Sequence, residues 1–215
     1  MTQATPGKRE QIVALLDTCA LLPPRLSDIL FDLALARLYF PHWTKQIEKE
    51  FLRNWPQVVG MPADSVALAE HRLDCFRGAT RGMYEIADYR PYYAKVPARV
   101  DKKDRHVVAA ALALRAHCEE GERAYLVSSN LRHLAPPECE KLGLIVLSPG
   151  AFIDELNASS PDDVERAVRK SIKDLLNPPI TEGDLLDCLR LHAATRTADR
   201  LAVLWAKPNA GKKRR

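Results

Sequence analysis

Glycine is scarce in this chain, which has 9 glycines in 215 residues. None of them lies in "DTCALLPP" (residues 17–24), directly after the first strongly apolar segment. A loop that cradles nucleotide phosphates needs glycines at that point. The sequence therefore argues against a nucleotide-binding α/β protein, although this class stays open as a third alternative.

Cysteine pairs at metal-binding spacing are also absent. The 5 cysteines are odd in number, are widely spaced and form no C-x-x-C motif: Cys19, Cys75, Cys118, Cys139 and Cys188. Neither a disulfide framework nor a zinc knuckle is indicated. We expect reduced thiols.

Long apolar runs are missing as well. No segment approaches the roughly 18 apolar residues of a membrane span. The opening "MTQATPGKRE" has no apolar core of the kind found in secretory signals. We therefore expect a cytoplasmic protein with no membrane partner.

A surplus of positive charge is present but small, with 32 Lys and Arg against 28 Asp and Glu. The final "KKRR" (residues 212–215) equals the whole excess of +4. We predict a basic, flexible tail over residues 208–215. Charge alone does not identify a nucleic-acid-binding protein.

Apolar runs alternate with helical patterns along most of the chain. Buried strands are predicted within 12–22, 123–130 and 143–149, with a brief strand or turn at 40–43 and a further strand with loops in 84–97. Helices are predicted over 27–39, over 44–55 with an end before Pro56, over 63–77, and over 104–122 with Gly121 as the C-cap. This alternation predicts an α/β protein with a parallel sheet covered by helices on both faces.

The pattern changes near Asn157. From there to residue 207 the sequence predicts a small extension of two or three helices, interrupted at Asn177-Pro178-Pro179. The predicted division is an α/β domain over 10–157, the helical extension over 158–207 and the basic tail.

Three carboxylates occupy related positions in this scheme. Asp17 ends the first strand, Glu50 lies in the helix from Thr44, and Asp104 begins an alanine-rich helix. Carboxylates gathered at one end of a parallel sheet repel one another unless a divalent cation is present. Oxygen ligands favour Mg²⁺ or Mn²⁺. The plainer interpretation of "DKKD" (residues 101–104) is a helix N-cap, and we expect this stretch to supply both an N-terminal cap and a metal-binding carboxylate.

In this order and spacing, the segments resemble the PIN-domain ribonucleases, most closely the VapC-type toxins of bacterial toxin–antitoxin pairs. The resemblance covers nearly the whole chain and is carried by "LLDTCALLPP", "HWTKQIEKEFLRN", "DKKDRHVVAAALA", "LVSSNLRHL" and "LLNPPITEGDLLDCL". It implies a three-layer α/β/α domain with a central parallel sheet, and a metal-dependent ribonuclease.

The resemblance also implies roles for single residues. Asp17, Glu50 and Asp104 would hold Mg²⁺ or Mn²⁺ and catalyse hydrolysis of an RNA phosphodiester. Asp101 would be a further ligand or a cap residue, and Glu48 a solvated surface carboxylate. A small antitoxin would inhibit the enzyme, and such domains commonly form homodimers.

One position departs from the family pattern. Asn130 matches, but His133 stands where the family commonly has an acid. Imidazole suits Mn²⁺ better than Mg²⁺. The departure therefore indicates a preference for Mn²⁺, a site of three carboxylates, or a loss of activity. Ser128 is a candidate to orient a ligand or water.

Cations flank the acidic positions in the sequence. Arg53, Lys102, Lys103 and Arg105 are candidates to bind RNA phosphates, although each alone is typical of a solvated surface. The competing interpretation is a catalytically impaired PIN-like module that binds RNA or a partner protein. Metal dependence of cleavage separates the two.

Overall fold

The computed structural model describes residues 11–62, 65–175 and 178–206. A four-stranded, all-parallel sheet forms its centre, with the strand order β2-β1-β3-β4. The strands are β1 (Ile12–Leu16), β2 (Phe40–His42), β3 (Arg123–Val127) and β4 (Ile145–Leu147). The helices are α1 (Thr18–Leu21), α2 (Pro24–Leu35), α3 (Lys45–Val58), α4 (Val66–Ala79), α5 (Arg105–Ala116), α6 (Pro136–Glu140), α7 (Pro149–Ser159), α8 (Pro161–Asp174), α9 (Glu182–Leu191) and α10 (Thr195–Trp205).

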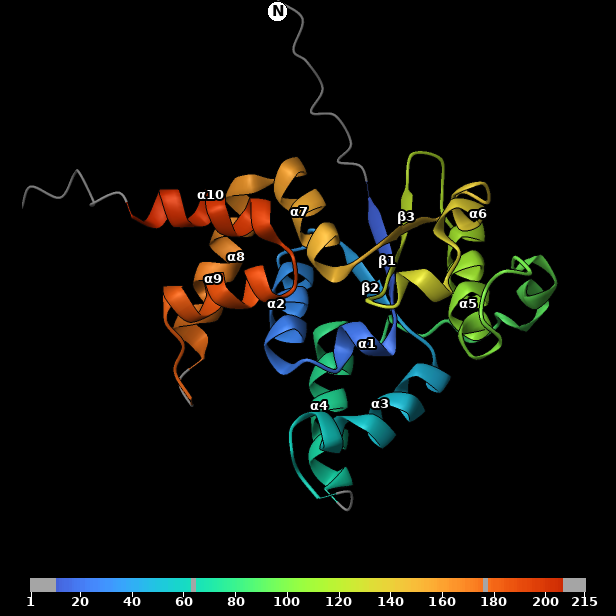
Figure 1. Ribbon diagram of the computed structural model, residues 1–215, viewed down its shortest axis with the longest axis horizontal. Coiled ribbons are helices and arrows are strands. Elements are labelled where there is room, and N and C mark those ends of the chain that lie inside the picture. The colour runs from blue at the N-terminus through green and yellow to red at the C-terminus, as the bar shows by residue number, and fades with distance from the viewer. Residues whose placement is uncertain (1–10, 63–64, 176–177, 207–215) are drawn as a thin grey trace, which may run out of the picture.

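The central strands are apolar because both faces of the sheet are covered. Every residue of β1 is buried, as expected for a strand in the middle of a parallel sheet. In Figure 1, α5 lies on one side of the strands, whereas α2, α7 and α8 lie on the other. The predicted α/β fold with a central parallel sheet and surrounding helices is confirmed, and it is consistent with a PIN-like α/β/α domain.

Helix α5 carries the alanine-rich run and packs closely on the sheet. Ala109, Ala110, Ala111 and Ala113 are fully buried, because a methyl side chain lets a helix approach the strands without a gap. The helix ends at Ala116, so the predicted C-cap at Gly121 is wrong. Gly121 instead lies in the turn before β3, with a φ of 89° that suits glycine.

Two other element predictions are wrong. Helix α3 continues through Pro56 to Val58, since the proline lies in the last turn, where the missing N–H removes a single bond and the ring is buried. Residues 84–97 do not form a strand among the described residues. They contain one isolated bridge between Trp43 and Glu85 and a 3₁₀ helix, Arg90–Lys95.

The C-terminal extension has three helices, α8, α9 and α10, and it packs on α2 and α7. A Cβ atom on Gly150 of α7 would lie 2.0 Å from the carbonyl oxygen of His192, so glycine permits close contact with the α9–α10 turn. Buried Asp154 of α7 accepts hydrogen bonds from the Thr197 N–H (2.8 Å) and hydroxyl (2.6 Å) at the start of α10. Helix α7 is therefore joined tightly to the extension.

The predicted boundary at 157/158 lies inside α7, and the three-part division stays a prediction. Asn177 and the basic tail over 208–215 lie outside the described residues. Within the ranges that the structure describes, no helix combines the length and the apolar character needed to cross a membrane.

Candidate functional site: a carboxylate cluster at the sheet end

The carboxyl ends of β1 and β3 lie side by side at the centre of the sheet. Leu16 pairs with Val127, and the Asp17 N–H donates to the Val127 carbonyl at 3.0 Å. Asp17 and Ser128 therefore leave adjacent strands at the same edge. This is the position where open parallel sheets bind ligands.

Asp17 is held by neutral donors. Its carboxylate accepts from the Thr18 N–H (2.7 Å), the Ser128 hydroxyl (2.6 Å) and the Cys19 thiol (3.1 Å). Burial, together with the charge of Asp17, raises the pKa of Cys19 to about 12. The thiol is therefore protonated and acts as a donor. These contacts fix the orientation of Asp17 without neutralising its charge.

Glu50 reaches the same region from α3. Its carboxylate accepts from the Thr18 hydroxyl at 2.9 Å and lies 3.3 Å from Nε2 of His106. Burial raises the pKa of Glu50, but the hydrogen bond and charge of His106 outweigh it, so the pKa is lowered overall. Thr18 thus links two of the predicted acids, since it contacts both Asp17 and Glu50.

His106 is buried at the start of α5 and orients this pair. Its Nδ1 lies 2.9 Å from the Lys103 carbonyl, so Nε2 faces Glu50. Burial lowers the pKa of His106, whereas Glu50 raises it more strongly, and the pKa lies above its ordinary value. Glu50 therefore faces an imidazole whose protonated form its charge favours.

Asp104 has a different environment. Its carboxylate accepts from the Asn130 side-chain amide at 3.0 Å and makes no hydrogen bond that caps α5, so the capping part of its prediction is wrong. Burial raises the pKa of Asp104, Lys103 opposes this effect, and the negative charge of Asp17 raises the pKa further. The pKa of Asp104 therefore lies above the ordinary value, mainly because the carboxylate is partly buried without a cationic hydrogen-bond donor.

Asp101 and His133 complete the cluster. Nδ1 of His133 contacts the Asp101 carboxylate and lies 4.0 Å from Oδ2 of Asp104. One ligand atom from each of the three side chains falls within 4.8 Å of the others, so the group has the dimensions of a metal site. Nε2 of His133 accepts from Arg132 at 2.8 Å, which leaves Nδ1 directed at the two acids.

The structure thus arranges the predicted acids in a chain of contacts. Thr18 joins Glu50 to Asp17, and Ser128 donates to Asp17 while accepting from the Asn130 N–H at 3.0 Å. Asn130 then contacts Asp104. The roles of these residues as metal ligands and catalysts stay predictions.

Glu48 is not a solvated surface residue, contrary to the prediction from the sequence. It is only 3% exposed, and it accepts from Trp43, Lys45 and Arg77. Burial raises its pKa, but these donors lower it overall to about 2. An acid two residues from Glu50 points to the opposite side of α3, and there it meets α4 rather than water.

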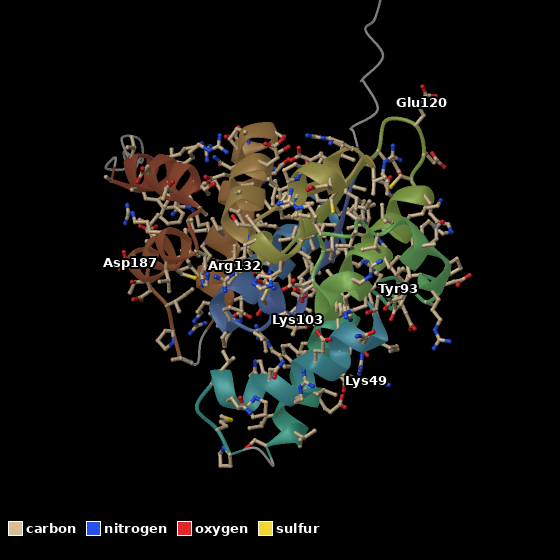
Figure 2. The ribbon with its side chains drawn as sticks, turned by 45° about the vertical axis from the view of Figure 1, so that its right-hand side comes forward. Lys49, Tyr93, Lys103, Glu120, Arg132 and Asp187 are labelled. Atoms are coloured by element: carbon tan, nitrogen blue, oxygen red, sulfur yellow. The ribbon has the colours of Figure 1, made fainter. Side chains whose placement is uncertain are left out.

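The predicted cations differ in their surroundings. Arg53, Lys102 and Lys103 are exposed, and Figure 2 shows Lys103 and Lys49 on the face where α3 approaches α5. Arg105 instead donates to the carbonyls of Tyr93, Val96 and Pro97. Its guanidinium holds the loop before α5, which makes it a structural residue in this arrangement.

Three contributors to the cluster escaped sequence reasoning. Thr18 and Cys19 follow Asp17 directly. A run of three polar side chains after a buried strand was a signal in the sequence that could have pointed to their part in the site. His106 has no such local signal, because its contact with Glu50 joins residues that are 56 positions apart. Only the fold brings that pair together.

The C-terminal part of the chain matches one known family. Residues 149–203 match the VapC50 C-terminal domain. The match spans α7 to α10, the helices joined by Gly150 and Asp154, and it points to a VapC-family protein. No curated protein and no solved structure gives a significant match to the chain.

Proposed function

We propose that the protein is a metal-dependent endoribonuclease, the toxin of a toxin–antitoxin pair. The observation that carries this proposal is the chain of contacts from Glu50 through Asp17 to Asp104 at the carboxyl end of the sheet, next to the group of Asp101, Asp104 and His133. The VapC-type C-terminal match supports the same class.

The residues present suit a divalent cation. Asp17, Glu50 and Asp104 supply oxygen ligands, and Asp101 and His133 add a carboxylate and an imidazole next to Asp104. Burial is the main cause of the raised pKa of Asp104, and a bound cation would favour the charged form of this carboxylate. Such an ion would polarise a phosphate oxygen and activate a water molecule for in-line hydrolysis.

The protein's own groups would orient these acids. Ser128 and Thr18 fix Asp17, Asn130 fixes Asp104, and His106 fixes Glu50. Exposed Arg53, Lys102 and Lys103 would contact phosphates of the RNA, and their charges would offset repulsion between the acids and the substrate. A small antitoxin would inhibit by covering this face.

The decisive experiment measures cleavage of a mixture of structured RNAs by metal-stripped protein with Mg²⁺ or Mn²⁺ added. We expect cleavage that depends on metal and falls at least about 100-fold in Asp17→Asn/Asp104→Asn. A matched control is Glu70→Gln/Asp187→Asn, which removes two exposed carboxylates elsewhere and should leave the rate unchanged. Circular dichroism verifies folding of both variants.

The histidine permits a sharper test of the metal. Replacing it by the acid that the family commonly carries, His133→Asp, should lower the ratio of Mn²⁺-supported to Mg²⁺-supported cleavage by about tenfold, because imidazole favours Mn²⁺. An unchanged ratio would remove His133 from the metal site.

A second function is favoured by His133 itself, which already pairs with Asp101. In that case the protein is a PIN-like module that binds RNA or a partner without cleavage. Antitoxin-free protein that binds RNA but cleaves with neither metal would support this alternative and exclude the nuclease.

A further inference from the structure

Two arginines occupy backbone positions that favour glycine. Arg37 follows the C-cap of α2 with a φ of 59°, and Arg81 follows the C-cap of α4 with a φ of 54°. Helices commonly end with glycine in this left-handed conformation, which is unfavourable for other side chains by roughly 1 kcal/mol. The chain tolerates that strain at both helix ends and keeps a cation at each.

Both arginines line the same cavity. It has a volume of about 220 Å³, and its wall also includes Phe40, Thr80 and Met83. The two guanidinium groups are exposed and form no ion pair or side-chain hydrogen bond with any other residue that the structure describes. Two cations therefore converge on one hollow without a described counter-ion.

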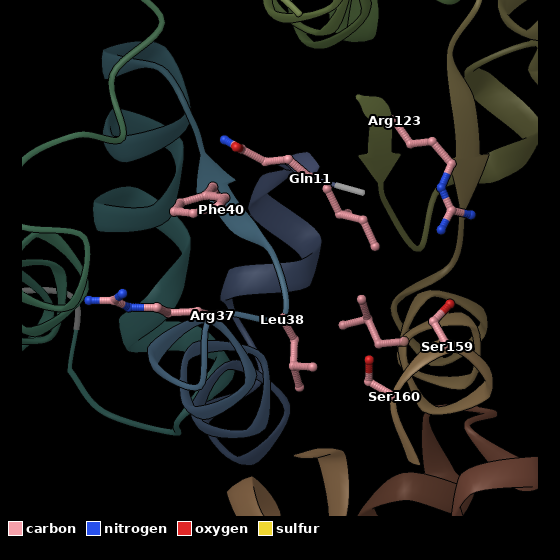
Figure 3. A pocket seen from close by; sticks show the side chains of 9 residues that line it. Gln11, Arg37, Leu38, Phe40, Arg123, Ser159 and Ser160 are labelled. Atoms are coloured by element: carbon pink, nitrogen blue, oxygen red, sulfur yellow. The ribbon is translucent and has the colours of Figure 1, made fainter. Parts of the chain in front are cut away.

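A second cavity adjoins the first at Arg37 and Phe40, which line both. It has a volume of about 330 Å³ and includes Arg123, Ser159 and Ser160. Figure 3 shows Arg123 on the side of the two serines, with Arg37 extending away from them. The two hollows thus flank Phe40, with a guanidinium group on each side of it.

The two adjoining cavities, together called the paired hollow, are separate from the carboxylate cluster. Phe40 pairs with Val13, which lies four residues before Asp17 along β1. At about 3.3 Å per residue, the two regions are roughly 13 Å apart along the strand direction. The hollows therefore lie toward the amino end of the sheet.

We propose that the paired hollow is an auxiliary RNA-binding site, in which Arg37 and Arg81 contact phosphates and a base stacks on Phe40. This proposal rests on the proposed ribonuclease function. Guanidinium groups form paired hydrogen bonds to phosphate, and exposed aromatic rings near cations bind single-stranded nucleic acid. Phe40 is 41% exposed, so its ring is available.

Neither a helix-dipole effect nor a second copy of the chain accounts for the paired hollow as well as RNA does. A cation at a helix C-terminus interacts favourably with the helix dipole, but that effect does not explain why both arginines line one cavity. A second copy of the chain would bring arginine toward arginine across a two-fold axis, which is unfavourable. An RNA strand provides the opposite charge that both arginines lack.

The site implies that the substrate is long enough to reach both regions. We therefore expect strong binding of an RNA of 30 nucleotides and weak binding of a tetranucleotide. Binding is measured by fluorescence anisotropy in the Asp17→Asn/Asp104→Asn background, where the RNA remains intact.

In that background, Arg37→Gly and Arg81→Gly should each weaken binding of the 30-mer by about threefold, and the double variant by about tenfold. The slope of log K against log salt should become shallower by about 1.4, since each phosphate contact contributes about 0.7. Glycine suits both backbone positions, so the thermal midpoint should be retained. Lys141→Ala, which removes an exposed cation elsewhere, should change neither quantity.

The outcomes separate this proposal from the nuclease. Unchanged affinity and salt slope in the double variant, or no binding of the 30-mer by the parent, would overturn the auxiliary site. RNA cleavage by the wild-type chain would still support the proposed nuclease function, because that function does not depend on the auxiliary site. Loss of affinity for a synthetic acidic amphipathic peptide, with RNA binding intact, would assign the hollow to a protein partner and also overturn the proposal.

Discussion

Glu48 and Asp104 are both withdrawn from water, but the protein treats their charges in opposite ways. Glu48 accepts from Arg77, Lys45 and the Trp43 indole, and its pKa falls to about 2. Asp104 accepts from a neutral amide, and its pKa is raised by burial first and by the charge of Asp17 second. The first carboxylate accepts hydrogen bonds from two cations within the fold, whereas the second accepts one from a neutral amide.

The same contrast extends to their neighbours. Asp154 is saturated by donors at the start of α10, as a structural carboxylate should be. Asp17 is surrounded by hydroxyl, thiol and amide donors that orient it without a cation. Donors within the fold thus hold Glu48 and Asp154 as structural acids, whereas Asp17 and Asp104 accept their hydrogen bonds from neutral groups.

The largest expected change in the free energy of unfolding comes from replacing Glu48, whose charge is compensated within the fold. Glu48→Ala should lower the free energy of unfolding by about 3 kcal/mol, because it leaves Arg77 and the Trp43 indole without their buried acceptor. Urea unfolding measures this. Glu70→Ala is the matched control, since Glu70 is an exposed partner of the same arginine at 3.7 Å and should contribute less than about 0.5 kcal/mol. Equal losses of unfolding free energy in Glu48→Ala and Glu70→Ala would show that Glu48 is not specially compensated.

Metal should stabilise the uncompensated cluster. A concentration of Mn²⁺ at 100 times its dissociation constant adds about 2.7 kcal/mol to the stability of the native state. For a chain of this size, that corresponds to a rise in thermal midpoint of roughly 5 to 10 °C. Asp104→Asn should remove most of this rise and Glu70→Gln none of it. A shift that persists in Asp104→Asn would show that the ion binds elsewhere.

Acid should remove the contribution of Glu48. Its native pKa of about 2 lies below the ordinary value of 4.5, so its stabilisation is complete above pH 4.5 and is lost as the pH falls toward 2. Between pH 7 and pH 3.5 this amounts to roughly 1 to 2 kcal/mol. Urea unfolding at both values should show that Glu48→Gln loses less stability than the wild type. Equal losses of stability in the wild type and in Glu48→Gln would indicate that other titrating groups dominate the effect of acid.

The sequence predicted the parts of this fold that depend on local pattern. The buried run of β1, the alanine face of α5 and the Thr44 cap of α3 follow from residue type and spacing, and they place Asp17 and Glu50 on their elements correctly. The surroundings of the acids depend on contacts between distant segments. Glu48 was assigned to the surface because its partner Arg77 is 29 residues away.

The same limit explains the error at Asp104. An aspartate before a helix is typical of an N-cap, and the pattern could not reveal that Asn130 would engage its carboxylate. Asp101 and His133 are paired although they lie 32 residues apart. The sequence therefore showed that His133 departs from the family pattern, but it could not show that Asp101 is its partner. Local rules located the acids, and long-range contacts decided which of them were compensated.

The smallest expected change in the free energy of unfolding is an increase, and it tests directly whether Asp104 differs from Glu48. In metal-free protein, Asp104→Asn should raise the free energy of unfolding by about 0.5 to 1 kcal/mol, because it removes a partly buried charge that Asp17 also repels. The raised native pKa means that Asp104 opposes folding above its pKa and stops doing so once it is protonated. The gain should therefore be present at pH 7, shrink as the pH falls through the raised native pKa of Asp104, and be gone below the ordinary value of 3.8. Urea unfolding in EDTA measures it, and a loss of stability would mean that the Asn130 hydrogen bond outweighs the repulsion, which would place Asp104 with Glu48 among the structural acids.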